Sequence, residues 1–447
     1  MKSLISLVII FIMILVSIAV NLPIVFPLIA GLFLFYFYGI KKGFKLREML
    51  FMTFKGIVKS RLILEIFILI GAITSLWLFS GSIPYLVYHS LNLIHPYLFI
   101  FMAFLVSSFI SILLGTSFGV VSTIGIVIIT VARTSSININ LVAGAIIAGA
   151  YFGDRISPMS SSANLVASIT GTNLYRNIKN MAKSTFIPLL IVMAMYLAIS
   201  FFNPLEIYEN PVESHIMQTF KLNWLCLLPV IILFTLIIFK VRIKLAMFIS
   251  ALCAFFVSVF FQDFSFIEVL KGTFTGFHLE AENPLNKIIS GGGIFSMLYP
   301  GLVVAISSAY AGILEKTGML EDLEKFIAKT IKKYGNFTGI TLLSIITCAV
   351  GCTQTMGIIL GEQLSENIYR KTGKTKEELA LDIEDSAVLI APLIPWNMAG
   401  MVPAMTLSVG IGYIPFAFYC YIPTIYILIK RYLNHKQFLL KHSNCGN

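Results

Sequence analysis

The sequence predicts an all-α polytopic membrane protein that contains two inverted-topology repeats with broken helices or re-entrant hairpins. Three observations predict this class. Hydrophobic residues make up 58% of the 447 residues and charged residues only 12%, whereas roughly 25% of an average soluble domain is charged. Apolar stretches that suit about 30 Å of hydrocarbon recur along the chain. Glycine and hydroxyl residues interrupt two long apolar regions, one in each half.

The apolar segments give the expected transmembrane helices. The long ones are Leu4–Val20, Ile24–Ile40, Leu62–Phe79, Tyr97–Leu114, Phe186–Phe202, Trp224–Phe239, Leu245–Phe261 and Ile411–Ile429. With the shorter segments described below, we expect about 11 or 12 spans. The second segment follows the first within a few residues, which favours a retained first helix over a cleaved signal peptide.

The net charge of +11 indicates topology. Basic residues gather between apolar segments, at 41–61, 176–183, 240–244, 325–333 and in the tail at 430–441. They form no single stripe of the kind that binds nucleic acid, so no nucleic-acid partner is expected. The positive-inside bias places these loops, and both termini, in the cytoplasm.

Two loops carry the opposite signal. Residues 81–96 contain no Lys or Arg, and residues 203–221 contain three glutamates and one lysine. Both loops are expected outside the cell.

The interruptions define a repeat. The apolar region at 97–132 is too long for one span and is broken at 115–119, and the region at 337–360 is broken at 351–357. Glycine and hydroxyl residues inside such regions predict a broken helix or a helical hairpin.

An acid, a proline break and an asparagine follow each interruption. The spacing from Gly115 to Asp154 is similar to the spacing from Gly351 to Asp385. Asp385 is therefore expected to be the second copy of Asp154. The first unit enters the membrane from the side without Lys or Arg, and the second enters it from a lysine-rich loop. Opposite entry predicts inverted repeats, as in many secondary transporters.

The predicted organisation has five parts. Residues 1–61 form a helical hairpin with a basic loop, 62–202 the first repeat, 203–288 connecting helices, 289–430 the second repeat and 431–447 a basic tail.

Asp154 is the strongest candidate site residue. The 13 residues of Leu141–Gly153 form a helix of about 20 Å, which ends near mid-depth. Small residues recur every four positions there, so a neighbouring helix can approach closely. The Ser157-Pro158 break would free carbonyls beside the carboxylate, and Na⁺ binds such oxygens. Alternatively, Asp154 pairs with Arg155 or caps the next helix.

The second unit offers Glu384 and Asp385. Adjacent acids point to different helix faces, so at most one of them faces a site. We choose Asp385, with Ser386 as its neighbour. The alternative is an ordinary acidic pair at a helix start, where the helix dipole favours negative charge.

Neutral polar residues in the two interruptions suit cation coordination. These are Thr116, Ser117, Ser122, Thr123, Thr353, Gln354 and Thr355. Each one singly often bonds its own backbone instead. Asn164, Trp396 and Asn397 could close the site, although Trp396 could also lie at the membrane interface.

Nothing in the sequence indicates catalysis. The six histidines are scattered in loops and tail without an HExxH motif, so we expect no enzyme and no cofactor. The expected partners are membrane lipids and a transported or coupling cation, with Na⁺ at Asp154. A homodimer is an open alternative.

Four sequence blocks resemble the NhaC family of sodium/proton antiporters. They are GTSFGVVSTIGI from Gly115, GAYFGDRISPMS from Gly149, GTNLYRNIKNM from Gly171 and EDSAVLIAPLIPWN from Glu384. The resemblance implies an antiporter in the inner membrane of a prokaryote that exchanges Na⁺ for H⁺, so that both ions are expected partners. We expect it to work by alternating access. It also admits coupling of these ions to a small carboxylate, such as malate and lactate, or to an amino acid.

One position departs from the family pattern. The family usually reads SDTTN where this chain has SSSAN, so Ser161 replaces an acid. The loss of a titratable group makes a Na⁺-coupled organic substrate a stronger alternative.

Overall fold

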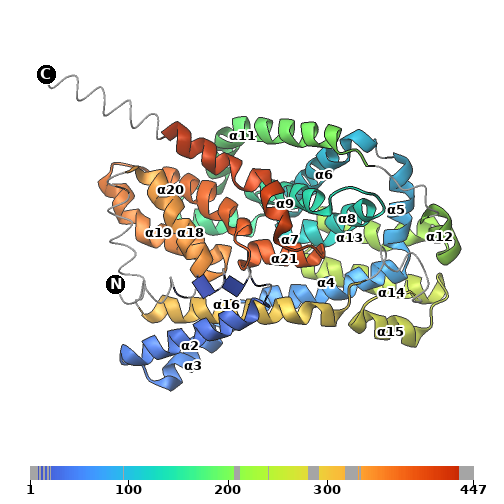
Figure 1. Ribbon diagram of the computed structural model, residues 1–447, viewed down its shortest axis with the longest axis horizontal. Helices are drawn as coiled ribbons and strands as arrows, with labels where there is room; N and C mark the ends of the chain where they lie inside the picture. The colour runs from blue at the N-terminus through green and yellow to red at the C-terminus, as the bar shows by residue number, and fades with distance from the viewer. Residues whose placement is uncertain are drawn as a thin grey trace.

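The expected all-helical fold is present in the computed structural model (Figure 1). The structure describes residues 22–93, 95–205, 212–239, 241–279, 291–317 and 334–431, with isolated residues 9, 12–13, 16–17, 20 and 331. Within these ranges, β-type pairing is limited to isolated bridges, such as the one between Phe277 and Gly291. Most of the first apolar segment, Lys240, the lysines of 325–333 and the tail from 432 onward lie outside the described residues.

The first half of the chain runs from α2 to α11. Its helices are α2 (Val25–Lys41), α3 (Leu46–Lys59), α4 (Arg61–Phe79), α5 (Ser82–Leu93), α6 (Phe99–Leu114), α7 (Ser117–Val120), the π-helical turn η2 (Val121–Gly125), α8 (Ile126–Arg133), α9 (Ile139–Ile156), α10 (Ser161–Thr170) and α11 (Leu174–Phe202).

The second half runs from α12 to the end of the described chain. Its helices are α12 (Val212–Thr219), α13 (Leu228–Ile238), α14 (Ile243–Phe260), α15 (Phe266–Thr275), α16 (Leu298–Thr317), α18 (Asn336–Gly351), α19 (Gln354–Lys371), α20 (Lys376–Ile383), the π-helical turn η6 (Glu384–Val388), the short η7 (Ala391–Leu393), α21 (Met398–Thr406), and the 3₁₀ turns η8 (Ile411–Phe416) and η9 (Phe418–Cys420).

The apolar helices confirm a multi-pass membrane protein. Among the described residues, Pro96–Leu114, Ile139–Ile156 and Leu174–Phe202 are long and apolar enough to span, and two bent pairs of helices raise the count to five at most. Six shorter apolar helices accompany them. Broken helices fall below full-span length, so the expected total of about 11 or 12 spans stays a prediction.

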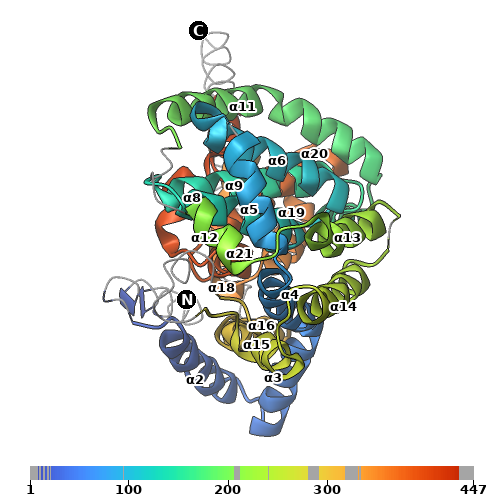
Figure 2. The same cartoon turned by 90° about the vertical axis from the view of Figure 1, so that its right-hand side faces the viewer.

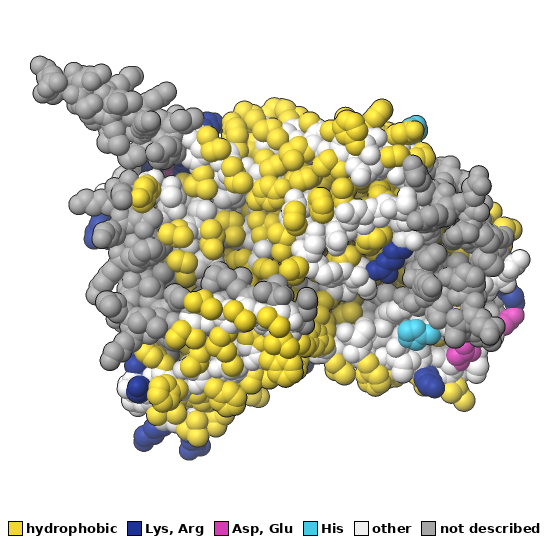
Figure 3. Space-filling view, in the orientation of Figure 1, with side chains coloured by type: hydrophobic (Ala, Val, Ile, Leu, Met, Phe, Trp, Pro, Cys, Tyr) yellow, Lys and Arg dark blue, Asp and Glu magenta, His cyan; other side chains and the backbone are white. Residues whose placement is uncertain are grey.

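Large apolar side chains cover the outside of these helices. Figure 3 shows hydrophobic side chains spread across the face it draws. Phe33 on α2 is 71% exposed and Phe202 on α11 is 84% exposed. An apolar surface of this extent is unusual for a soluble monomer and suits contact with lipid.

The two repeats share one register. Four helices of the first unit and their counterparts in the second unit begin 237 residues apart. The pairs are α6 and α18 (336 − 99), α7 and α19 (354 − 117), α9 and α20 (376 − 139), and α10 and α21 (398 − 161). Helices α4 and α16 show the same offset (298 − 61). The described helices thus contain the two expected units. Their opposite orientation in the membrane, and the exact domain boundaries, stay predictions.

The first interruption reverses the chain. Gly149 and Gly153 of α9 lie against Phe104 and Ser111 of α6, in the same order along both helices, so α6 and α9 run parallel. Gly125, after the interruption, packs instead on Ile146, an earlier residue of α9. The segment after Gly115 therefore runs back, and the helical hairpin is the correct alternative.

The second interruption forms a similar hairpin. Asn336, the first residue of α18, donates a hydrogen bond to Thr372, which follows the last residue of α19 (2.7 Å). The two helices are therefore antiparallel, with their connection at Cys352.

The helices gather into two groups (Figure 2). We call α2–α4 and α14–α16 the flanking group, since α3 packs on α16 and α4 on α14. We call α6–α11 and α18–α21 the broken-helix group. A cavity of about 480 Å³ lies between them, lined by α4, α15 and α16 on one side and by α8 and α21 on the other.

Candidate functional site

The tip of the first hairpin packs against the break that follows α9. Gly115 closes α6 in the left-handed conformation (φ 63°), which glycine adopts without strain. A Cβ atom there would lie 2.6 Å from the backbone of Met159 in the break. The Thr116 side chain then begins α7 by accepting a hydrogen bond from the Gly119 N–H. The predicted Thr116 is thus a helix cap beside the break.

The tip of the second hairpin is built in the same way. Cys352 takes the left-handed conformation (φ 54°), and the Thr353 side chain caps α19. The Cys352 carbonyl accepts a hydrogen bond from the N–H of Met398, the first residue of α21 (2.9 Å). In each repeat, therefore, the hairpin tip and the later helix break meet.

Asn397 and Trp396 hold this second junction. Asn397 is fully buried, and its amide donates to the Cys348 carbonyl (2.8 Å). The Trp396 indole is 2% exposed and donates to the Ala349 carbonyl (2.6 Å). The interfacial placement of Trp396 is therefore wrong, because the protein interior surrounds the ring. Both residues satisfy carbonyls at the end of α18, which has no continuing helix to do so.

Asp154 lies where the first hairpin tip meets the break. It sits in the last turn of α9 and is 5% exposed, and its Oδ1 atom has no hydrogen-bond partner among the described residues. The hydroxyls of Ser117 and Ser160 face the carboxyl group. Ser117 was expected at this site, whereas Ser160 was not. These oxygens give Asp154 the surroundings of a cation ligand.

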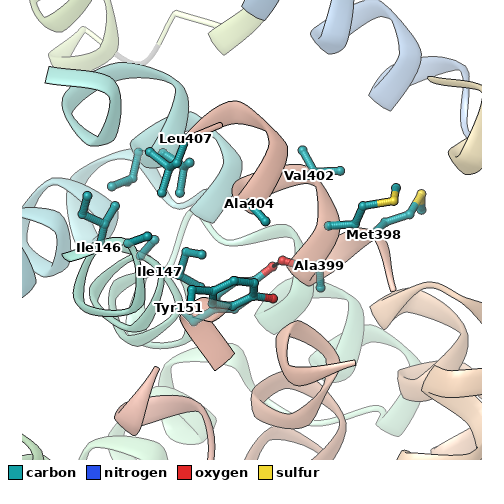
Figure 4. Close-up of a cluster of buried hydrophobic side chains, with 14 of the residues drawn as sticks. Ile146, Ile147, Tyr151, Met398, Ala399, Val402, Ala404 and Leu407 are labelled. Atoms are coloured by element: carbon teal, nitrogen blue, oxygen red, sulfur yellow. Dashed lines mark hydrogen bonds between the residues drawn. The ribbon is translucent and has the colours of Figure 1, made fainter. Parts of the chain in front are cut away.

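Tyr151 joins Asp154 to the second repeat. One turn before the acid, its hydroxyl donates to the Ala399 carbonyl at the start of α21 (2.6 Å; Figure 4). Ile147 lies beside the ring, and Met398 and Val402 of the second repeat belong to the same buried cluster (Figure 4). The broken helices α9 and α20–α21 therefore meet at this depth.

Arg155 pairs with the second repeat and not with its neighbour. The guanidinium is fully buried and forms an ion pair with Asp385. It also donates to Thr185 (2.6 Å) and Tyr419 (3.2 Å). The alternative in which Arg155 neutralises Asp154 is therefore wrong.

Asp385, chosen from the sequence, is the acid that Arg155 neutralises. Its neighbour Ser386 donates to the Asp382 carbonyl (2.6 Å) and contacts Ser344 (2.9 Å). Ser386 is thus bonded elsewhere, and the charge of Asp385 is balanced by Arg155, although its Oδ2 atom has no hydrogen-bond partner among the described residues.

Glu384, which we set aside in the sequence analysis, is the acid that has no direct partner in the described chain. It is 1% exposed, and neither carboxylate oxygen has a hydrogen-bond partner in the described chain. Arg155, Asp154 and Asp385 all act electrostatically on Glu384. Glu384 also begins the π-helical turn η6, and such turns often mark functional sites.

The repeat register changes how the two predicted acids relate. With the constant offset between the matching helices, Asp154 corresponds to Ala391 and Asp385 corresponds to Ala148. The expectation that Asp385 is the second copy of Asp154 is therefore wrong. The expectation compared the distances from Gly115 and Gly351 to the two acids, whereas the counterpart of Gly115 is Cys352. The two acids also lie on different turns of the matching helices.

Two predicted residues of the first break support the backbone. Ser157 donates to the Ile112 carbonyl (2.7 Å). Asn164 is exposed, and its amide donates to the carbonyls of Pro158 (3.1 Å) and Ser160 (2.6 Å). The structure does not bring Asn164 to Asp154. Both side chains instead satisfy carbonyls that the break leaves open.

The remaining predicted hydroxyls and amide also bond to backbone. Thr123 and Ser122 donate to the Gly119 carbonyl (2.7 and 3.2 Å), which is the open alternative for hydroxyls in membrane helices. Gln354 donates to a carbonyl of η6 (3.0 Å), and Thr355 is exposed. Of the predicted set, Ser117 is the hydroxyl that faces Asp154.

Comparisons with known proteins agree with this architecture. The model of the Na⁺/H⁺ antiporter family matches residues 149–434. The chain is 30% identical to the Na⁺/H⁺ antiporter NhaC of Bacillus subtilis, over 81% of this chain and 82% of that protein. It is 28% identical to the malate-2H⁺/Na⁺-lactate antiporter of the same organism, over 85% and 82%. It is 25% identical to the arginine/ornithine antiporter ArcD of Halobacterium salinarum, over 81% and 77%.

Proposed function

The chain belongs to the Na⁺/H⁺ antiporter family, and from this premise we propose that it exchanges Na⁺ for H⁺ across the cytoplasmic membrane by alternating access. The observation that carries the proposal is the buried Asp154 carboxylate, which has an unpartnered oxygen at the junction of the two repeats in the described chain. A buried carboxylate without a partner is strongly disfavoured in its charged form. It is therefore stable when it holds a proton or a cation.

Exchange follows from competition at this carboxylate. The hydroxyl oxygens of Ser117 and Ser160 face this carboxylate and would be ligands of a Na⁺ bound there, and a proton at Asp154 would remove the charge that holds the ion. One site then binds either Na⁺ or H⁺. Ser161, where the family pattern has an acid, is exposed at the start of α10. The missing acid therefore leaves the buried pocket unchanged, which weakens the case that Ser161 made for an organic substrate.

Alternating access requires that the site face each side in turn. We propose that the broken-helix group moves against the flanking group. The cavity of about 480 Å³ lies between these groups. A second cavity, of about 270 Å³, is lined by Asp385, Ser184 and the basic residues Lys183, Lys430 and Arg431, on the side that the charge bias places in the cytoplasm.

The proposal is tested with Asp154→Asn in proteoliposomes that contain a pH-sensitive dye. We expect a Na⁺ gradient to drive proton movement through the unmodified protein and not through this variant. The matched control is Asp263→Asn, because Asp263 is exposed and pairs with Lys221 far from the site. Unchanged Na⁺-driven proton movement in Asp154→Asn would contradict the assignment.

A second candidate function is exchange of a small organic acid or amino acid coupled to these ions. The larger cavity favours it, because Arg133 lines that cavity among apolar side chains, as suits a small carboxylate. The names of two relatives include such substrates. Proton movement in the same dye assay separates the two functions. A Na⁺ gradient alone drives proton movement through a simple antiporter, whereas an exchanger of organic substrate requires that substrate.

A further inference from the structure

We propose that the smaller cavity binds the phosphate group of an anionic phospholipid from the leaflet on the cytoplasmic side. The cavity has a volume of about 270 Å³ and lies between α11 and the last described helix, at residues 422–431. Figure 1 shows this helix, drawn in red, beside the first turns of α11. The inference goes beyond the proposed exchange, because the lipid is a bound component and not a transported ion.

Basic side chains from both helices line the cavity. Lys183 belongs to α11, and Lys430 and Arg431 belong to the last helix. The Ser184 hydroxyl lies beside them in the same lining. Ammonium groups and hydroxyls are donors that suit phosphate oxygens, and basic pockets between membrane helices on the cytoplasmic side suit lipid headgroups. The lysines are 247 positions apart (430 − 183), so the fold builds this site.

The acid that lines the cavity is already neutralised. Asp385 forms the buried ion pair with Arg155. The charge of Arg431 is balanced as well, because both terminal nitrogens of its guanidinium donate to the Asp382 carboxylate (2.7 and 2.5 Å). Neither of these acids therefore balances a lysine of the cavity.

The two lysines keep their charges uncompensated within the described chain. Both are exposed, and the described residues include no ion pair of Lys183 or Lys430. The Lys430 Nζ atom lies 5.9 Å from the centre of the Tyr426 ring, which also lines the cavity. A cation over an aromatic ring keeps its full charge. Two positive charges thus remain at the cavity, and an anionic phosphodiester would reduce this excess.

The apolar surface beside the cavity favours a lipid over a free phosphate ion. Ile187 lines the cavity one turn after Lys183 and is exposed, and Leu190 continues this exposed apolar surface along α11. Ile425 is exposed on the other helix, about one turn before Lys430. These side chains lie further from the cytoplasmic ends of their helices than the lysines do. Acyl chains would therefore cover them while the phosphate group binds the lysines.

The proposal is tested by titrating the purified full-length protein, in a neutral detergent, with fluorescent phosphatidylglycerol. We expect saturable binding that zwitterionic phosphatidylcholine does not displace. Each lysine near an anionic lipid contributes roughly fivefold to its attraction. Binding to Lys183→Gln/Lys430→Gln should therefore be about 30-fold weaker.

The matched control is Lys179→Gln/Lys371→Gln, which removes two exposed lysines of α11 and α19 that do not line the cavity. It should bind as tightly as the unmodified protein. Equal weakening in both double variants would show diffuse attraction to a basic surface and would overturn the site. Unchanged binding in Lys183→Gln/Lys430→Gln overturns it too. Displacement by inorganic phosphate at the same concentration as unlabelled phosphatidylglycerol would make a free anion the ligand, and the lipid assignment would be wrong.

A second measurement needs no variant. Phosphatidylglycerol with a photoactivatable group in its acyl chain is bound to the unmodified protein and crosslinked, and the labelled peptides are mapped. We expect label on the peptides that contain Ile187 or Ile425. Label confined to other peptides contradicts the proposal. Neither measurement requires transport, so the results are independent of whether Na⁺ is exchanged for H⁺.

Discussion

The ion pair between Arg155 and Asp385 joins the two repeats through side chains that are both almost completely buried. Removing one member of such a pair leaves an uncompensated charge in the interior, which costs about 3–5 kcal/mol. We therefore expect Arg155→Met to lower the thermal stability of the detergent-solubilised protein strongly. The double variant Arg155→Met/Asp385→Leu should recover most of the loss, because it leaves no lone charge.

Fluorescence-detected size-exclusion chromatography after heating measures this effect. The matched control is Lys221→Met, which breaks the exposed pair with Asp263. Exposed pairs contribute little, so its melting temperature should hardly move. Equal losses in the single and double variants would mean that Arg155 stabilises the fold through its hydrogen bonds and not through its charge.

Single residues were predictable where local physics decides their role. The burial of Asp154 could be predicted, because an acid before a proline break has few structural explanations in an apolar helix. The choice of Asp385 over Glu384 could not take the ion pair into account, because the pair depends on which acid Arg155 reaches across 230 residues. The π-helical turn adds to the difficulty, since face assignments from sequence assume regular α-helical spacing.

At the scale of helices, the close packing of α6 on α9 depends on glycine. A Cβ atom on Gly153 would overlap the Cβ atom of Ser111 and would lie 2.5 Å from the Ser108 carbonyl oxygen. We expect Gly153→Ala to destabilise the protein by about 1–3 kcal/mol, as overpacked cores do. Gly410→Ala is the matched control, because nothing lies within 4 Å of its added Cβ. Urea or heat denaturation in detergent compares them, and equal stabilities would contradict the close contact.

The first hairpin tip gives a second test at this scale. Gly115 and Gly171 both have left-handed backbones (φ 63° and 64°), but a Cβ on Gly115 would meet the Met159 backbone at 2.6 Å, whereas on Gly171 it would meet only Lys376 Nζ at 3.8 Å. Alanine at either position carries the left-handed strain of about 1–2 kcal/mol. Gly115→Ala should therefore be the less stable variant in the same denaturation assay. The reverse order would show that the tip does not pack on the break.

Helix breaks could be predicted from composition, but their geometry could not. The glycine and hydroxyl residues at 115–119 and 351–357 marked both interruptions correctly. The choice between a broken helix and a hairpin needed the parallel pairing of α6 with α9, which is a tertiary contact. The second turn was harder to place, because a non-glycine residue, Cys352, takes the left-handed position.

For the whole molecule, the sequence predicted two units but misaligned them. The matching helices keep one constant offset, whereas the acids that suggested the match do not. A single site between two repeats needs each of its side chains only once. The two repeats can therefore supply different residues to it. Here α9 supplies Asp154 and Arg155, and the matching helical segment supplies Glu384 and Asp385.

The last prediction concerns movement of the broken-helix group against the flanking group. Thr74 on α4 and Thr406 on α21 line the cavity between the groups from opposite sides. In a background in which the six native cysteines are replaced, Thr74→Cys/Thr406→Cys linked by a bifunctional thiosulfonate should stop exchange, and reducing agent should restore it. Tyr36→Cys/Thr53→Cys joins α2 and α3 within the flanking group, where the two hydroxyls lie 2.7 Å apart, so its linkage should leave exchange unchanged. Full exchange through linked Thr74→Cys/Thr406→Cys would mean that the two groups do not move relative to each other, and that gating lies within the hairpins themselves.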